Sequence, residues 1–547
     1  MKTKKGSGQT EEQRLLCELA YGLFREFRGA YLAEWQRLER CERMYRGDHW
    51  HDVPQNDPNE PRPVTPIIQS TVENMKAELM DRIPEAVILA ESPADTEIAH
   101  VIEAIIKQNH DADGYAKEYR KIVHDLLVGG YCVQEVGYDN SLNGGLGGAF
   151  LRHVDVRSIL FDPLATEPQE ARAVFKLSLK TREYIGSHFP KAAPFLTADA
   201  FGRPDAVEDG ILHADRQDAM LFLEYWWREY DAENERYHVH MAQIAGNQVL
   251  ADSREAKPDG LFEHGLYPFV VTPLFTRKGS CLGLGLVDLF ETQQKYADKL
   301  DQIVLKNALM ASHNKLLVTE ASGFDTEDLR DWSKEVHTGE SLNGVTWFST
   351  PPLPAYIIGY IGSIRESIKQ ESGANEFSRG SANGGVTAAS AIAAMQEMSN
   401  KRARMIARAL HESFRDAIRL EIEVEREFNF FTRRVNVIVD GKLKECTFES
   451  AMLVRRSGKG RALLPIEFYI SVKAQQETKY AAMTQNELAL RMLQSGMMTP
   501  AQAVELMVFE GKDQLLKQIR EQNEEAKALA AQQQNLPQNA GTAGRNT

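Results

Sequence analysis

The chain has 547 residues, of which 43% are hydrophobic and 26% are charged, and its formal net charge is −14. This is an ordinary globular composition in a chain long enough for several hydrophobic cores. The acidic balance argues against a protein that grips nucleic acid, because such proteins neutralise phosphates with lysine and arginine. This net charge is compatible with a surface along which DNA moves without binding tightly.

No apolar run is long enough to cross a bilayer, and the basic start MKTKKGSGQT has no apolar segment behind it. We therefore expect no secretory signal, and we expect the chain to stay in the compartment where it is made. Widely spaced cysteines without a C-x-x-C motif argue against a disulfide scaffold or a zinc ribbon and favour buried thiols. These cysteines are Cys17, Cys41, Cys132, Cys281 and Cys446.

Residues 1–281 are typical of a mixed α+β region. Apolar residues at steps of three or four predict a helix over 11–46, whose apolar face is Leu15, Leu19, Leu23, Phe27, Tyr31, Trp35 and Leu38. Further helices are predicted at 67–82 and 95–129, and Thr181 begins a short one. Alternating apolar residues predict strands at 85–90, 131–138, 150–156, 173–179, 220–228, 236–244 and 267–276.

Two predicted helices then bracket an insert of about forty residues, a plausible size for a small lobe. The first covers 284–312, with an apolar face of Leu286, Leu289, Phe290, Gln293, Tyr296, Leu300 and Ile303. The second covers 357–372, with a narrow stripe of Ile357, Ile361, Ile364 and Ile368. The insert is predicted to contain strands, turns and a short acidic helix at 326–336.

A segment rich in Gly, Ala, Ser and Asn follows at 373–391 and cannot form a core. Thr387 is a candidate N-cap for a helix from Ala388 to about Phe430, with a stripe of Ile406, Leu410, Phe414, Ile418 and Ile422. Strands are predicted at 434–440, which turns at Asp440-Gly441, and at 464–473. Helices are predicted over 475–532 with a break at Gly496 and Pro500, and the residues from about 533 are predicted to be disordered.

No P-loop, H-E-x-x-H or G-x-S-x-G motif occurs in the sequence. Gly283-Leu284-Gly285 lacks the third glycine of a dinucleotide fingerprint, which favours a turn at a helix start. The pairs His49/His51 and His238/His240 favour surface or hydrogen-bonded histidines over a metal site, because neither has a third ligand at suitable spacing. We therefore predict no catalytic residue, no metal and no cofactor.

Two further patterns have a structural and a functional interpretation. Glu421, Glu423, Glu425 and Glu427 favour a solvated acidic band on a helix, with an acidic ring in an oligomer as the alternative. Trp226-Trp227 in a predicted strand favours core or interface packing over a ligand platform.

The order of these elements resembles that of the portal, or head–tail connector, proteins of tailed bacteriophages, from about residue 30 to 520. The run Met44-Tyr45-Arg46-Gly47-Asp48-His49-Trp50 is similar to the family's aromatic-x-Gly-x-x-Trp close to its first helix, with His49 where glutamine is common. Residues 125–139 are similar to the helix-to-strand entry of the family's wing. Residues 154–163 and 170–174 are similar to the strand, Asp-Pro turn and following strand found there.

The resemblance implies the portal fold, an α+β fold with a mixed wing, a helical stem, a small α/β clip, a long wing-crossing helix and a C-terminal helical crown. The segments are the wing 1–281, the stem helix 282–312, the clip 313–356, the second stem helix 357–372, the tunnel loop 373–387, the long wing helix 388–432, the wing strands 433–474, the crown 475–532 and a disordered tail 533–547.

The resemblance also implies a non-enzymatic ring, dodecameric in the family, that is assembled in the host cytoplasm and occupies one capsid vertex of the virion. Double-stranded DNA passes through such a ring, without sequence-specific binding, during packaging and ejection. The implied partners are the terminase large subunit, a tail adaptor or head-completion protein, and the capsid and scaffolding proteins, with no membrane.

Two sets of site residues follow from the resemblance. The tunnel-loop residues expected at the DNA channel are Asn375, Glu376, Phe377, Ser378, Arg379, Ser381 and Asn383. The clip residues expected to face a partner are Glu327, Asp328, Arg330, Asp331, Trp332 and Lys334, for which a simple solvated helix is the alternative. For the whole protein, the alternative is a helical scaffold or adaptor protein of a virion without a DNA channel, and a metal-dependent nuclease or hydrolase is a third.

Overall fold

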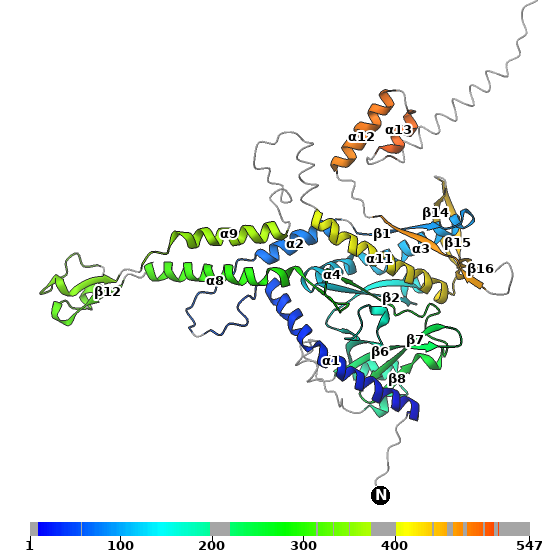
Figure 1. Ribbon diagram of the computed structural model, residues 1–547, viewed down its shortest axis with the longest axis horizontal. Coiled ribbons are helices and arrows are strands. Elements are labelled where there is room, and N and C mark those ends of the chain that lie inside the picture. The colour runs from blue at the N-terminus through cyan, green and yellow to red at the C-terminus, as the bar shows by residue number, and fades with distance from the viewer. Residues whose placement is uncertain are drawn as a thin grey trace, which may run out of the picture. The chain divides into compact units, whose positions relative to one another are not determined.

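The computed structural model describes residues 9–55, 57–81, 83–196, 219–312, 315–331, 333–348, 351–372, 401–439, 442–456, 463–473, 479–495, 498–507 and 512. The chain divides into two compact units (Figure 1). The larger consists of Met1–Val386 and Met395–Ala474, and the smaller of Thr387–Ala394 and Gln475–Thr547. Helices and sheets are both present, as predicted for an α+β protein.

Helix α1 (Glu11–Tyr45) begins at a capping box, in which the Thr10 hydroxyl accepts from Gln13 N and the Gln13 side chain accepts from Thr10 N. Its aromatic residues from Tyr21 to Trp35 are buried, which confirms the predicted helix, but Leu15 and Leu19 are exposed. The predicted face is wrong in these first turns because a line of strict four-residue steps drifts by about 40° per step around a helix.

Residues 95–129 form two helices, α3 (Thr96–Asp113) and α4 (Tyr115–Val128), where a single helix was predicted. Gly114 separates them with a φ of 73°, and its N–H bonds to the carbonyl of His110. This left-handed conformation costs glycine little and ends a helix. Helix α2 (Ile67–Met80), predicted at 67–82, packs against α4.

Five antiparallel strands form one sheet in the order β4-β5-β6-β7-β8. They are β4 (Ile159–Phe161), β5 (Ala173–Thr181), β6 (Ala219–Asp231), β7 (Arg236–Ala245) and β8 (Gln248–Asp252). Phe175 packs edge-on against Phe24 and Phe27 of α1. Trp226 and Trp227 are both buried, which confirms the predicted core packing. Thr181 caps α6 (Arg182–His188), as predicted.

A second antiparallel sheet has the order β3-β2-β9, and helix α11 (Lys401–Phe428) packs on it. Its strands are β2 (Tyr131–Asp139), β3 (Gly148–Val154) and β9 (Phe269–Pro273), and the short turn α5 (Leu142–Gly145) joins β2 to β3. Gln134 Nε2 donates to Ser413 Oγ of α11 at 2.9 Å. The predicted stripe of α11 is buried along its whole length, from Ile406 to Ile422.

The acidic residues near the end of α11 are not the solvated band that was expected, because Glu421 and Glu425 are buried. Glu425 accepts hydrogen bonds from Asn109 Nδ2 at 2.6 Å and Ala149 N at 2.7 Å, and Glu421 Oε1 lies 2.9 Å from His110 Nε2. The prediction is wrong because α3 and β3, distant in sequence, supply partners that offset the cost of burial.

Three antiparallel strand pairs complete the larger unit's C-terminal part: β1 (Glu85–Ala90) with β18 (Phe468–Lys473), β14 (Arg433–Val439) with β15 (Lys442–Phe448), and β16 (Val454–Arg456) with β17 (Leu463–Pro465). The predicted turn residues Asp440 and Gly441 lie outside the described residues. Strands β8 and β15 were not predicted.

In the smaller unit, α12 (Lys479–Gln494) and α13 (Pro500–Leu506) are described, and α13 begins at the predicted break, Pro500. The other predicted break residue, Gly496, lies outside the described residues. All five cysteines are buried free thiols, as predicted. In the part of the chain that the structure describes, no helix is long and apolar enough to span a membrane.

Candidate functional site

Helices α8 (Leu286–Ser312) and α9 (Ala355–Ser372) lie side by side (Figure 1). Arg365 Nη2 of α9 donates to Asp301 Oδ2 of α8 at 2.7 Å, and Gln293 Nε2 of α8 donates to Glu371 Oε2 of α9 at 3.3 Å. Later residues of α8 therefore meet earlier residues of α9, so the two helices are antiparallel. Both helices were predicted, and α9 begins two residues earlier than expected.

The apolar face predicted for α9 agrees with the burial of its residues better than the face predicted for α8. The stripe of α9 is confirmed, since Ile361 and Ile368 are buried. The face of α8 is only partly correct. Leu286 and Phe290 are buried, but its predicted members Leu289, Tyr296 and Ile303 are exposed.

The start of α8 is tied to α1 by a buried arginine. Arg37 Nη1 donates to Asp288 Oδ2 of α8 at 2.5 Å, and Arg37 Nη2 donates to Glu34 Oε1 at 2.6 Å and to the carbonyl of Gly129 at 2.7 Å. Burial alone would lower the pKa of Arg37, but the bonds and charges of Glu34 and Asp288 raise it above its ordinary value. The guanidinium therefore stays charged where α1 meets α8.

A polar cluster holds α8 and α9 to the connector before α2. His49 Nδ1 lies 2.5 Å from Asp298 Oδ2, and both side chains are buried. Thr65 N donates to the same carboxylate at 3.1 Å, and Thr65 Oγ1 donates to Asp301 at 2.9 Å. Because Arg365 also bonds Asp301, one network joins the residues after α1 to both helices.

A small antiparallel pair, β12 (Lys315–Val318) with β13 (Val345–Phe348), lies between α8 and α9 in sequence. The acidic helix predicted over 326–336 is wrong, because the described residues of this range form a 3₁₀ turn, Asp328–Arg330, and no longer helix. The side chain of Asp325 accepts from Glu327 N at 2.9 Å, and that of Asp331 accepts from Ser333 N at 3.0 Å. Such local bonds compete with a helix.

The predicted clip residues lie on and beside this turn. Glu327, Arg330 and Lys334 are exposed. Asp328 pairs with Lys334, and this bond lowers the pKa of the Asp328 carboxyl. Asp331 is half-buried, and Trp332 lies outside the described residues.

The predicted tunnel loop lies outside the described residues. This applies to each nominated channel residue: Asn375, Glu376, Phe377, Ser378, Arg379, Ser381 and Asn383. The proposed N-cap, Thr387, also lies outside them. The described chain ends at Ser372 of α9 and resumes at Lys401 of α11.

The histidine pairs have ordinary hydrogen-bonding or packing roles. His238 Nε2 lies 3.3 Å from Asp231, and buried His240 packs beside Trp227 with ring centroids 5.5 Å apart. Within the described ranges, no group of three or more His, Cys, Asp or Glu side chains is arranged to hold a metal ion.

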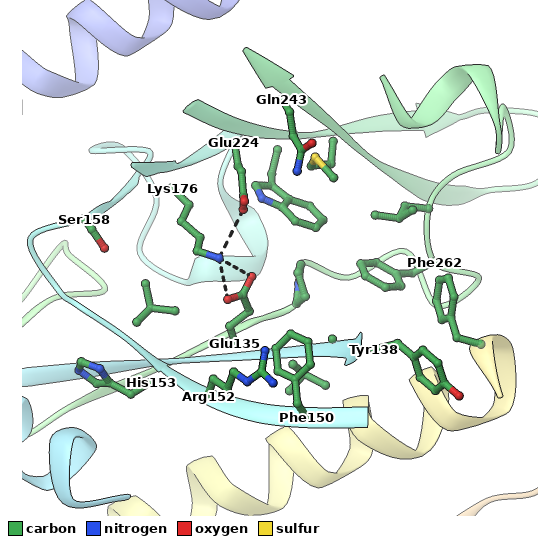
Figure 2. A pocket seen from close by; sticks show the side chains of 18 of the residues that line it. Glu135, Tyr138, Phe150, Arg152, His153, Ser158, Lys176, Glu224, Gln243 and Phe262 are labelled. Atoms are coloured by element: carbon green, nitrogen blue, oxygen red, sulfur yellow. Dashed lines mark hydrogen bonds and ion pairs between the residues drawn. The ribbon is translucent and has the colours of Figure 1, made fainter. Parts of the chain in front are cut away.

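A cavity of about 810 Å³ lies between the two larger sheets (Figure 2). Lys176 Nζ lies 2.8 Å from Glu135 Oε2 and 3.4 Å from Glu224 Oε2. Burial raises the pKa of Glu224 above its ordinary value, although Lys176 opposes this effect. Tyr138, Phe150 and Phe262 line the other part of the cavity. We interpret the lysine and its two carboxylates as an internal ion cluster.

Sequence reasoning missed the His49–Asp298 contact and the exposed apolar side chains of α8. Nothing near His49 in the sequence points to a residue 249 positions away. The exposed side chains do have a sequence signal, because Leu289, Tyr296, Ile303 and Met310 recur at steps of seven.

Two family models match the chain. The description "Phage P22-like portal protein" matches residues 22–272, and "Phage SU10 portal protein" matches residues 196–442. The two matched regions overlap and together span residues 22–442. Among curated proteins, no match is found.

Proposed function

Because the chain belongs to the portal proteins of tailed phages, we propose that it forms a ring at one capsid vertex, through which double-stranded DNA enters and leaves the head. The observation that carries this proposal is the run of two overlapping portal matches over residues 22–442. That range includes both larger sheets, the α8–α9 pair and α11.

The charge of the chain supports a conduit rather than a DNA-gripping protein. The formal net charge is −14. An acidic wall repels phosphates, so DNA that moves past it does not bind tightly. The motor function, which requires ATP hydrolysis, then belongs to the terminase and not to this chain.

We assign α8 and α9 to the stem, residues 313–356 to the clip and residues 373–387 to the tunnel loop. The clip then docks the terminase large subunit during filling and a tail adaptor or head-completion protein afterwards. The exposed charges of Glu327, Arg330 and Lys334 support a docking role. The capsid and scaffolding proteins would contact the wing.

Within the tunnel loop, Arg379 is the one cation of residues 373–387 and is the candidate for transient phosphate contacts. An Arg379→Glu ring is expected to package DNA more slowly or to a shorter length than the wild type. Packaging at the normal rate and length by that variant would refute a role for Arg379.

The ring itself is tested by negative-stain images and native mass of the purified protein. A closed ring with a central hole, of about twelve subunits in the resembled family, is the expected result. A compact monomer or an open oligomer without a hole would instead favour the alternative, a virion scaffold or adaptor protein without a DNA channel.

A further inference from the structure

The cavity between the two larger sheets has a polar part and an aromatic part (Figure 2). Its volume of about 810 Å³ lies within the range of sites for small organic molecules. Phe430, which follows α11, lines the cavity and is 84% exposed, so the cavity reaches the surface beside this ring. A molecule from solution therefore has a way in.

The polar part has more negative than positive charge. Lys176 Nζ donates to both carboxylate oxygens of Glu135, at 2.9 and 2.8 Å, but it lies 3.4 Å from Glu224 Oε2. Burial raises the pKa of Glu224 and Lys176 lowers it, while the charge of Glu135 raises it further, so that the pKa is above its ordinary value. Glu224 is therefore the less well paired carboxylate, and a second cation beside it would balance the cluster.

Two cationic side chains that also line the cavity, Arg152 and His153, do not offset this excess negative charge. Arg152 Nη2 donates to Asp113 Oδ1 at 2.6 Å and to Asp139 Oδ2 at 2.9 Å. His153 Nε2 lies 2.7 Å from Asp125 Oδ2. Both side chains are thus engaged by carboxylates other than Glu135 and Glu224.

The sheet neighbours of Glu224 place further polar groups at the same point. Glu224 lies opposite Lys176 on β5 and opposite Gln243 on β7, and Figure 2 shows Gln243 beside it. Trp226 lies two residues further along β6 and therefore on the same face. Trp226 is only 6% exposed, and its Nε1 has no hydrogen-bond acceptor among the described residues. Because a buried indole N–H usually has an acceptor, a bound molecule with an oxygen atom would supply the missing bond.

Aromatic rings line the other part of the cavity and continue from Trp226. Phe262 stacks on Trp226 with ring centroids 6.2 Å apart, and it packs edge-on against Phe428 at 6.0 Å. Tyr138 stacks on Phe428 at 6.1 Å. Water needs two to four polar partners and is poorly held against such a wall, whereas an apolar group gains from burial there.

We propose that this cavity binds an organic ammonium ion, with the ammonium group at Glu224, an oxygen atom at Trp226 Nε1 and an apolar body among the aromatic rings. The inference goes beyond the proposed ring and does not depend on it. Two sources share this chemistry. One is a free amine, and the other is a lysine side chain of a protein segment, whose backbone carbonyls supply the oxygen.

The probe is phenylethanolamine, which carries a primary ammonium, a hydroxyl oxygen and a phenyl ring. Isothermal titration calorimetry with the full chain measures its affinity. Phenylethylene glycol, in which a hydroxyl replaces the ammonium, should bind about tenfold more weakly, because the lost bond has a charged partner. Phenethylamine, which lacks the hydroxyl, should bind about threefold more weakly than phenylethanolamine.

Glu224→Gln should weaken the binding of phenylethanolamine about tenfold and leave that of the glycol unchanged. A chain with a net charge of −14 also attracts cations without a specific site. Glu183→Gln is therefore the matched control, because it makes the same change of charge at an exposed position of α6. This control should bind phenylethanolamine like the wild type, and thermal unfolding shows that both variants are folded.

Equal affinity of the wild type for phenylethanolamine and for the glycol would overturn the inference. Equal affinity of the wild type and Glu224→Gln for the amine would do the same, as would the absence of binding heat up to about 20 mM amine. Acetyl-phenylalanyl-lysine amide and its norleucine counterpart then separate the two sources. Tighter binding of the lysine peptide than of phenylethanolamine, lost with norleucine, would assign the cavity to a lysine of a protein segment. Weaker binding of that peptide would assign it to a free amine.

Discussion

At the scale of single residues, buried charges are held by partners that lie far away in the sequence. Glu425 accepts bonds from Asn109 and Ala149, and Arg433 Nη2 donates to Asn109 Oδ1 at 2.9 Å. Burial raises the pKa of Glu425, against the lowering effect of these donors and of Arg433. This cluster links α11 to α3 and β3. Because its charged groups are shielded from water, removal of one member alone would leave a partner buried and unpaired, which is costly.

The pair of His110 and Glu421 gives a prediction about pH. Burial alone would lower the pKa of His110, but the charge and hydrogen bond of Glu421 outweigh it and raise the pKa above its ordinary value. The folded state therefore holds the proton more tightly than the unfolded state. This stabilisation is complete below the unfolded pKa, about 6.5, and is lost as the pH rises through the folded value.

His110→Gln should lower the free energy of unfolding by roughly 1–3 kcal/mol at acidic pH, because it removes a charged hydrogen bond to a buried carboxylate. The deficit relative to the wild type should shrink as the pH rises above neutrality. Urea unfolding at a series of pH values from about 5.5 to 8.5 measures it. His188→Gln, at an exposed histidine of α6, serves as the control. A deficit that does not change with pH would contradict the assignment.

At the scale of elements, β2 and α8 begin where two glycine segments touch. Gly130 has a φ of 90°, and a Cβ added there would lie 2.3 Å from the backbone nitrogen of Gly285. No side chain fits at this distance without a backbone shift, and the positive φ adds strain. The close approach fixes where α8 leaves the larger unit.

Gly130→Ala should therefore lower the free energy of unfolding by about 3 kcal/mol or more, since strain and a backbone clash add. Gly22→Ala is the matched control, because Gly22 lies inside α1 and its added Cβ would meet no heavy atom within 4 Å. That control should be neutral or gain up to about 1 kcal/mol from helix propensity. Thermal unfolding of both variants measures the difference. Similar melting temperatures for Gly130→Ala and Gly22→Ala would contradict a close backbone contact at Gly130.

Elements with a strong apolar period, such as α1 and α11, could be predicted from the sequence because the period reports burial directly. Which side of a helix is buried was less predictable. A single predicted face on α8 merged side chains that pack inside the chain, such as Phe290, with side chains that are exposed, such as Tyr296. Short elements such as β8 and β15 were missed because a few residues carry too little pattern.

At the scale of the whole molecule, contacts between distant segments could not be derived from local pattern. Strand β1 pairs with β18, so that Ile88 lies opposite Ile470, and no periodicity specifies that partner. The same limit applies to the site. The charged residues nominated for the clip were chosen by their composition, and their partner-facing role stays a prediction. The bonds between Asp328 and Lys334 and between Asp331 and Ser333 depend on the turn that replaced the predicted helix.

If residues 313–356 are a clip that docks partners, removal of most of this insert should weaken docking without preventing ring assembly. Lys315 pairs with Phe348 across β12 and β13, so the ends of the insert are adjacent and a short Gly/Ser linker can replace residues 315–348. This variant should still form rings, since α8, α9 and both larger sheets lie outside the replaced residues.

The shortened ring should bind the terminase large subunit at least a hundredfold more weakly than the wild-type ring, because the docking surface is gone while ring formation is kept. Surface plasmon resonance on immobilised rings measures the affinity, and native mass confirms that the ring is intact. Rings of the Leu164→Glu variant provide the control, since Leu164 is exposed and lies outside residues 315–348. Normal terminase binding by the shortened ring would show that the docking surface lies outside residues 315–348. Loss of the ring would show that residues 315–348 contribute to the contact between copies.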